Sequence, residues 1–165
     1  NQNEIDDKNY SCEVTCIEPF LFEQLSGLPI NLVKNKVESL DIKIFSQLNE
    51  NDILFIDSSH IIRPQGDVLF EIQNILSQLN KGVLIHFHDI FTPRDYPEEW
   101  VYKNHNLWNE QYLLESFLAF NNYFEIIGSL NYLKHDHWDL LSSKCPILKS
   151  EKNREPGSFW IRKTS

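Results

Sequence analysis

The stretch VLIHFHDIF, Val83–Phe91, indicates what kind of fold this chain adopts. Its residues 83–87 are apolar except for His86, the polar pair His88-Asp89 comes next, and the stretch follows the chain-breaking pair Lys81-Gly82. A short apolar run between turn signals is typical of a strand buried on both faces, as in a parallel sheet. We therefore expect this stretch to be the central strand of a sheet.

A second stretch, ILFIDSSH at Ile53–His60, has the same design of apolar residues followed by an acid and a histidine. Between the two lies Gly66–Leu79, whose apolar residues recur every three or four positions, as in a helix with one buried stripe. The three segments predict a β-α-β unit with a right-handed crossover. Neighbouring strands lie about 5 Å apart, so Asp57, His60, His88 and Asp89 should converge on the sheet rim where open α/β folds bind ligands.

The rest of the chain alternates between strand and helix patterns, which predicts one α/β domain over residues 1–165. Residues 1–9 are polar and are expected to form a frayed tail. Further strands are expected at 10–17, 29–37, 124–133 and 158–163, and helical segments at 19–28, 39–48 and 109–120. Residues 92–106 should form a long loop and 134–155 an irregular segment. No helix pattern separates the last two strands, so they should form an antiparallel pair at one edge.

The composition excludes several classes of partner. A formal net charge of −9 argues against a nucleic-acid backbone or an anionic membrane as the main partner. No apolar run approaches the roughly 20 residues of a membrane helix, and the polar, acidic start does not resemble a signal peptide. Cys12, Cys16 and Cys145 are expected to be buried, reduced thiols, and the protein cytoplasmic.

The four polar residues at the predicted rim suit two kinds of chemistry. Carboxylates and imidazoles together bind divalent ions such as Mg²⁺, Mn²⁺ or Fe²⁺, which makes Asp57, His60, His88 and Asp89 candidate metal ligands. The same residues could abstract a proton, because histidine titrates near neutral pH. In the alternative interpretation, Asp57 and Asp89 cap the turns that follow them, and His86 is a core histidine bonded to a neighbour.

Residues away from the rim are candidates for cofactor and substrate binding. Glu18 ends the first predicted strand, where a carboxylate can accept hydrogen bonds from ribose hydroxyls, although it could equally be a solvated acid. Aromatic side chains could stack on a sugar or an aromatic acceptor, or could pack as a lid onto the sheet: Tyr96, Trp100, Trp108 and Tyr112. The group His135–His137 is interpreted as part of a solvated loop.

Several motifs together resemble the class I S-adenosylmethionine-dependent methyltransferases, and most of all a branch found beside sugar- and polysaccharide-biosynthesis genes. They are the strand followed by Glu18-Pro19, then FIDSSH, GVLIHFHDIF, DYPEEW, WNEQYLLESFLAF and GSFWIRK, and they span nearly all of residues 12–163. The resemblance implies a Rossmann-like sheet, mostly parallel, with strand order 3-2-1-4-5-7-6 and strand 7 antiparallel. It also implies S-adenosylmethionine as cofactor and a small-molecule methyl acceptor, for example a sugar or a natural-product intermediate.

Carried onto this sequence, the resemblance places Glu18 at the ribose and Asp57 near the methyl group. His88 and Asp89 would close the site, with Mg²⁺ or Mn²⁺ as a candidate ion. The usual acid for adenine has no direct match, since Lys36 lies near that place, with Glu38 two residues on. The backbone around Val37 would then contact adenine.

The sequence departs from the family in having no first strand and no glycine-rich loop, which normally approaches the methionine portion of the cofactor. We therefore expect an amino-terminally incomplete methyltransferase sheet, completed by a partner chain in a homodimer, by a rearranged sheet or by a further segment. Two other hypotheses stay open. One is a metal-dependent hydrolase or oxygenase that uses Asp57, His60, His88 and Asp89, and the other is a non-catalytic assembly module.

Overall fold

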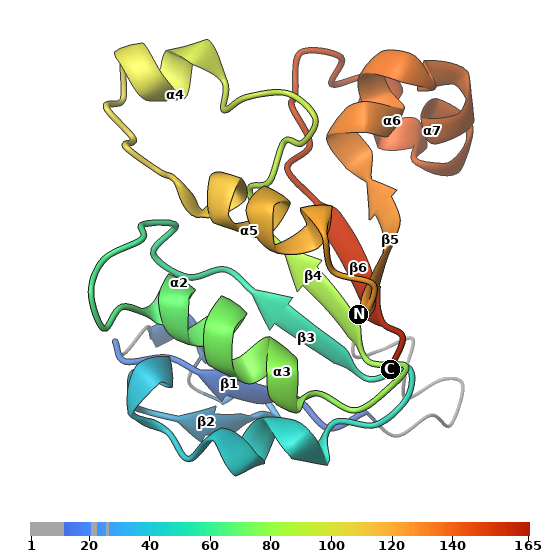
Figure 1. The fold of residues 1–165 in the computed structure, drawn as a ribbon. Coiled ribbons are helices and arrows are strands. Elements are labelled where there is room, and N and C mark those ends of the chain that lie inside the picture. Colours follow the sequence, from blue (N-terminus) through green and yellow to red (C-terminus); the bar gives the residue numbers. More distant parts are fainter. Residues whose placement is uncertain (1–11, 21–22, 26) are drawn as a thin grey trace. The chain divides into compact units, whose positions relative to one another are not determined.

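The computed structural model describes residues 12–20, 23–25 and 27–165 (Figure 1). These residues form two compact units, one that ends at Asp41 and one that comprises Ile42–Ser165. The tail predicted at residues 1–9 and part of the helix predicted at 19–28 lie outside the described residues.

The first unit contains a parallel pair of short strands, β1 (Thr15–Ile17) and β2 (Asn31–Val33). The 3-10 helix η1 (Glu23–Leu25) lies between them in sequence, and η2 (Val37–Ser39) follows β2. Both strands fall within the segments predicted for them, but each is shorter than its apolar pattern suggested. The parallel direction agrees with a helical connection between the strands.

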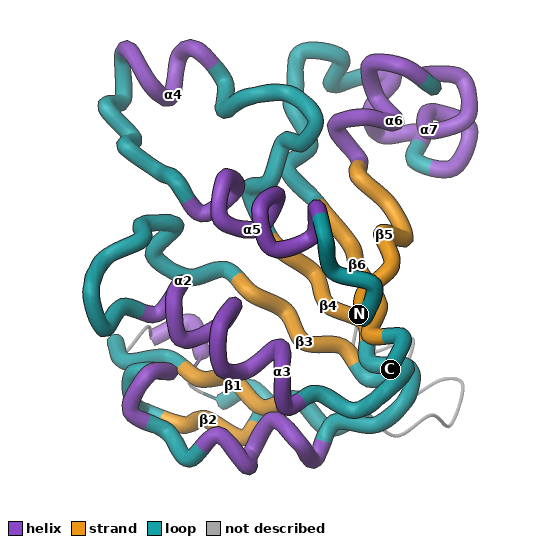
Figure 2. Tube along the Cα trace, in the orientation of Figure 1, coloured by secondary structure: helices purple, strands orange, loops and turns teal. Residues whose placement is uncertain are grey.

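The second unit contains a mixed sheet with the order β3-β4-β6-β5 (Figure 2). Its strands are β3 (Ile53–Ile56), β4 (Leu84–Phe87), β5 (Phe124–Ser129) and β6 (Phe159–Lys163). β3 and β4 are parallel, and β6 is antiparallel to both β4 and β5. The predicted antiparallel pair at one edge is therefore confirmed, with β5 as the edge strand and β6 as its interior partner. Phe159 and Ile161 of β6 are fully buried, which suits an interior strand, whereas β5 exposes Ile126.

Helices cover one face of this sheet (Figure 1). The helix predicted at Gly66–Leu79 forms as α2 (Asp67–Phe70), a π-helical turn η4 (Glu71–Ile75) and α3 (Leu76–Gln78). The second covering helix is α5 (Glu110–Ala119). The predicted apolar stripe is buried, including Val68, Ile72, Ile75, Leu76 and Leu79. It packs with the inward-facing side chains of the strands to form the core.

The predictions for the carboxyl-terminal third were wrong in two places. The strand predicted through Leu133 ends at Ser129, whose side chain accepts a hydrogen bond from the Tyr132 amide and caps α6 (Leu130–Asp136). The segment predicted to be irregular contains α7 (Trp138–Lys144) and η5 (Pro146–Lys149). A serine that caps a helix directly after an apolar strand ends the strand sooner than the apolar pattern alone suggests.

One further segment differs from expectation, because the long loop at residues 92–106 contains a short helix, α4 (Glu98–Tyr102). The segment predicted as helical at 39–48 contains η3 (Ile42–Gln47), as expected. The three cysteines are free thiols, but Cys12 is exposed and the other two are half-buried, so the prediction of buried thiols was wrong. Among the described residues, no helix has the length and apolar character to cross a membrane.

The central strand should dominate the stability of the second unit. Ile85 of β4 is fully buried, so Ile85→Ala removes apolar contacts and leaves a cavity, and we expect it to lower the free energy of unfolding by about 2–4 kcal/mol. The matched control is Ile147→Ala, because Ile147 is 57 % exposed. Urea unfolding measures both, and equal small losses would contradict this placement of the core.

Candidate functional site

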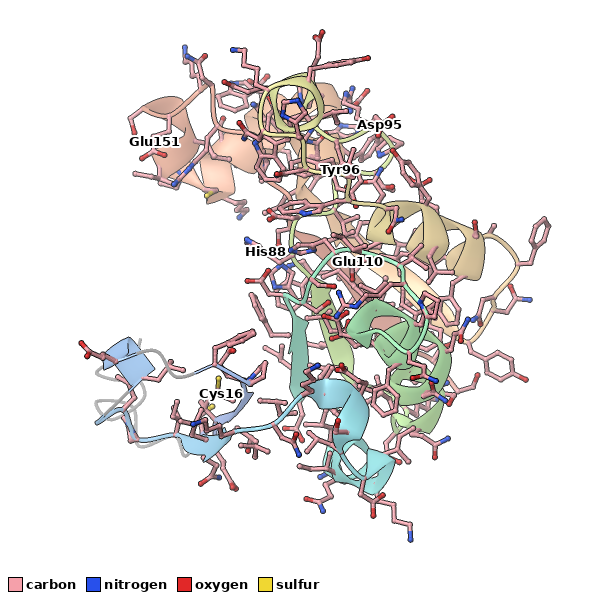
Figure 3. The ribbon with its side chains drawn as sticks, turned by 90° about the vertical axis from the view of Figure 1, so that its left-hand side faces the viewer. Cys16, His88, Asp95, Tyr96, Glu110 and Glu151 are labelled. Carbon is pink, nitrogen blue, oxygen red and sulfur yellow. The ribbon has the colours of Figure 1, made fainter. Side chains whose placement is uncertain are left out.

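The carboxyl ends of β3 and β4 bring two polar turns to the same rim of the sheet. Ile56 pairs with Phe87 in the parallel register, and the amide of His88 donates to the carbonyl of Ile56 over 2.9 Å. Asp57 and His88 are therefore the first residues beyond the paired strands. Figure 3 shows His88 and Glu110 near these strand ends, with Tyr96 and Asp95 farther from the sheet.

Three of the four residues predicted to converge bring ligand atoms together. One atom each from Asp57, His60 and Asp89 lies within 4.8 Å of the other two, and His60 Nε2 is 3.3 Å from Asp57 Oδ1. We call these three residues the rim cluster. Two carboxylate oxygens and one imidazole nitrogen form a donor set that suits Mg²⁺ or Mn²⁺.

His88 is not part of the rim cluster, although it was predicted as a ligand. Its Nε2 lies 3.5 Å from Asp89 Oδ1, and its side chain is 43 % exposed. Its ring packs against the rings of Phe55 and His86, with centroids 5.9 and 5.8 Å away. His88 is thus a solvent-accessible imidazole beside the rim cluster.

The turn after β3 is held by hydrogen bonds to the following helix. Ser58 Oγ donates to Glu71 over 2.8 Å, and Ser59 donates to Asp67 through both its amide and its hydroxyl. His60 then adopts a left-handed backbone conformation with φ of 58°, which histidine tolerates better than most residues. The sequence DSSH therefore encodes a turn whose two serines position the acid and the histidine.

The turn after β4 is equally constrained. Asp89 has a positive φ of 57°, and the amide of Ile90 donates to the carbonyl of Gly157. A Cβ at Gly157 would approach Asp89 Cα to 2.7 Å. Only glycine allows the segment before β6 to pass this close to the backbone of Asp89.

The sequence interpretation missed Glu110, which lies at the start of α5. This carboxyl group is 1 % exposed, and its Oε2 lies 2.8 Å from His60 Nδ1. An acid in the first turn of a helix usually indicates only a favourable interaction with the helix dipole, so the sequence offered no signal for this contact. The structure makes it the most direct partner of the buried imidazole.

Burial and neighbouring charges at the rim shift the pKa values of His60 and Asp89. Burial by itself would lower the pKa of His60, but the hydrogen bond and charge of Glu110, together with the charges of Asp89 and Asp57, outweigh burial and raise it. Burial also raises the pKa of Asp89, against the opposing charges of His88 and His60. Without a bound ion, the rim cluster therefore favours a protonated His60 between carboxylates.

His86 proves to be the core histidine that one interpretation expected. Its Nε2 is 2.7 Å from Ser158 Oγ, and its ring stacks on Trp160 with centroids 4.6 Å apart. Burial and the neighbouring His88 lower its pKa to about 4. Asp57 and Asp89 do not cap a helix in the described residues, because the next helix after Asp57 begins at Asp67 with Gly66 as its N-cap, and the next helix after Asp89 has Pro97 as its N-cap.

The predicted aromatic substrate residues divide into two groups. The Trp108 ring lies 4.3 Å from the His60 ring and contacts Trp100 edge to face, at 5.2 Å between centroids. Tyr96, in contrast, is only 6 % exposed, and its hydroxyl accepts from the Gln111 amide. Tyr112 donates to Asp95 on the surface. Trp108 is therefore the predicted aromatic residue in direct contact with the rim cluster, while Tyr96 packs as part of the lid.

The predicted cofactor residues Glu18, Val37 and Glu38 belong to the first unit. Glu18 directly follows β1, its amide donates to the Val33 carbonyl, and its Oε1 accepts from the amide of Phe20. Val37 and Glu38 lie in η2 after β2. Asp57, the fourth predicted cofactor residue, lies in the second unit. His135 and Asp136, interpreted as a loop, lie in α6, with His137 directly after it.

Glu71, which accepts a hydrogen bond from Ser58 in the turn after β3, is also absent from the predicted residues. It is 5 % exposed and begins the π-helical turn, a feature that often occurs at functional sites. Burial raises its pKa to about 8, although the hydrogen bond from Ser58 opposes the shift. Near neutral pH the folded protein therefore holds a protonated carboxyl group here.

This raised pKa predicts a pH-dependent stability. The stability contributed by protonated Glu71 is fully present below its unfolded pKa of 4.5 and is lost as the pH rises through about 8. Glu71→Gln keeps a hydrogen-bonding side chain but cannot ionise. Relative to wild type, we expect the variant to gain stability between pH 5 and pH 8, by on the order of 3 kcal/mol. Urea unfolding in the presence of a chelator measures this gap. A gap that does not change with pH would contradict the assignment.

Comparisons with known proteins give no family for this chain. Neither the protein-family models, nor the curated proteins, nor the solved structures with which it was compared include a match. The function is therefore argued from the fold and from the rim cluster.

Proposed function

We propose that the chain is a methyltransferase domain that uses S-adenosylmethionine to methylate an oxygen or nitrogen of a small molecule. The observation that supports this most is the strand order β3-β4-β6-β5, with β6 antiparallel inside the sheet. It agrees with the 4-5-7-6 part of the strand order implied by the sequence resemblance. The parallel pair β1-β2 agrees with strands 2 and 3 of that order.

The residues proposed to act in methyl transfer lie after strands, as ligand residues do in open α/β sheets. S-adenosylmethionine, when bound, supplies the methyl group. Glu18 would accept hydrogen bonds from its ribose hydroxyls, and the segment at Val37 and Glu38 would contact adenine. Asp57 would lie near the methyl-bearing end.

The rim cluster fits a divalent cation by its donor set and its spacing. Asp57, His60 and Asp89 would hold the ion, which would lower the pKa of an acceptor hydroxyl bound beside it. His88 is the accessible imidazole next to Asp89 and is proposed to take the acceptor proton. Trp108, which packs on His60, would form one wall of the acceptor site, and this suits a planar or sugar-like molecule.

A metal-dependent hydrolase is the second candidate. It is favoured by one observation, namely that every residue of the rim cluster lies within the second unit. Such a site needs no residue of the β1-β2 unit. The two proposals differ in whether Glu18 takes part in ligand binding.

Calorimetric titration of the chain with S-adenosylhomocysteine, with and without Mn²⁺, tests the methyltransferase proposal. We expect micromolar binding by the wild type and weakening by roughly tenfold or more in Glu18→Gln, because a charge-assisted hydrogen bond to the ribose is lost. Glu23→Gln, which changes an exposed residue of η1, is the matched control and should bind normally. Mn²⁺ binding without binding of S-adenosylhomocysteine would reject the methyltransferase and favour the hydrolase.

A further inference from the structure

We infer that Glu110 is the positioning residue of the rim cluster: it holds the proton of His60 on Nδ1, so that Nε2 is the nitrogen presented to a cation at Asp57 and Asp89. This inference rests on the proposed cation site and adds a residue to it. Glu110 does not itself contribute a ligand atom to the rim cluster.

Glu110 is buried, and no lysine or arginine among the described residues forms an ion pair with it. Its carboxyl group is 1 % exposed, and in the part of the chain that the structure describes, its one ion-pair partner is His60. Its Oε1 is buried with no hydrogen-bond partner. Burying a carboxyl group with one unpaired oxygen costs free energy, and the hydrogen bond between its other oxygen and His60 Nδ1 is the interaction that offsets this cost.

The two acidic neighbours of His60 determine which ring nitrogen carries the proton of the neutral imidazole. An ionised carboxylate only accepts hydrogen bonds, so each of its two acidic neighbours attracts the imidazole proton. Glu110 lies at 2.8 Å from Nδ1, whereas Asp57 lies at 3.3 Å from Nε2. Asp57 is 48 % exposed and can be hydrated, but Glu110 cannot. The neutral imidazole therefore keeps its proton on Nδ1 and leaves the lone pair on Nε2.

One continuous segment, residues 108–110, contacts both the ring and the backbone of His60. The Trp108 ring packs on its imidazole, and the amides of Asn109 and Glu110 both donate to its carbonyl. Asn109 Oδ1 accepts from the amide of Ile62, two residues after His60. The start of α5 thus determines the backbone, the ring plane and the proton position of one histidine, as an outer carboxylate does for a metal-binding histidine.

Mn²⁺ titration followed by electron paramagnetic resonance tests the inference on Glu110→Gln. We expect the variant to bind Mn²⁺ roughly 10- to 100-fold more weakly than wild type, because the neutral amide no longer strengthens Nε2 as a donor. Its thermal midpoint in the presence of a chelator should be unchanged or higher, since a buried charge is removed. A purely structural role would instead lower the midpoint and leave the affinity intact. Glu125→Gln changes the net charge equally at an exposed site of β5 and should bind as wild type does.

Imidazole ¹⁵N NMR of the metal-free wild-type chain gives a readout that requires no variant of Glu110. Recorded above the pKa of His60, and assigned by the signals lost in His60→Gln, the spectrum should show the proton on Nδ1. A proton on Nε2, or unchanged Mn²⁺ affinity in Glu110→Gln, would overturn the inference. Absence of Mn²⁺ binding by the wild type would reject the cation site itself, and Mn²⁺ binding without S-adenosylhomocysteine binding would reject the methyltransferase alone.

Discussion

The parallel pairing of β3 with β4 is the constraint on which the site depends. Because Ile56 lies opposite Phe87, the two turns that follow these strands begin at the same level of the sheet. Asp57 and His60 come from one turn and Asp89 from the other, and a shift of the register by one residue would separate them and reverse the faces of the side chains. The fully buried Ile85 and Phe87 disfavour such a one-residue shift, because it would turn both side chains to the opposite face of the sheet.

Two buried acidic residues support the turn after β3, although acidic side chains are rarely buried in protein cores. Glu71 and Glu110 are both nearly inaccessible, yet they serve different purposes. Glu71 is kept protonated by burial and bonds Ser58, which holds the turn. Glu110 bonds His60 and organises the imidazole. Two carboxyl groups in different environments thus support one turn, Glu71 through Ser58 and Glu110 through His60.

Much of the fold was predictable because local pattern and tertiary environment agree. The β-α-β unit follows from two apolar runs and an amphipathic segment between them, and the convergence of Asp57, His60 and Asp89 follows from that unit. Prediction failed where a local capping signal competed with an apolar pattern, as at Ser129, where the strand ends and α6 begins. The role proposed for His88 stays a prediction, since the adjacency of His88 to Asp89 in sequence says nothing about which way its ring turns.

The sequence by itself determined the alternation of strands and helices, the central position of Val83–Phe91 and the identity of the polar residues after the strands. These properties depend on periodicity and on residue type, which are local. The tertiary structure alone decided that Glu110 contacts His60 across 50 residues of chain. Long-range pairing depends on which surfaces are buried together, and no local pattern around Glu110 distinguishes a carboxylate that faces solvent from one that faces an imidazole.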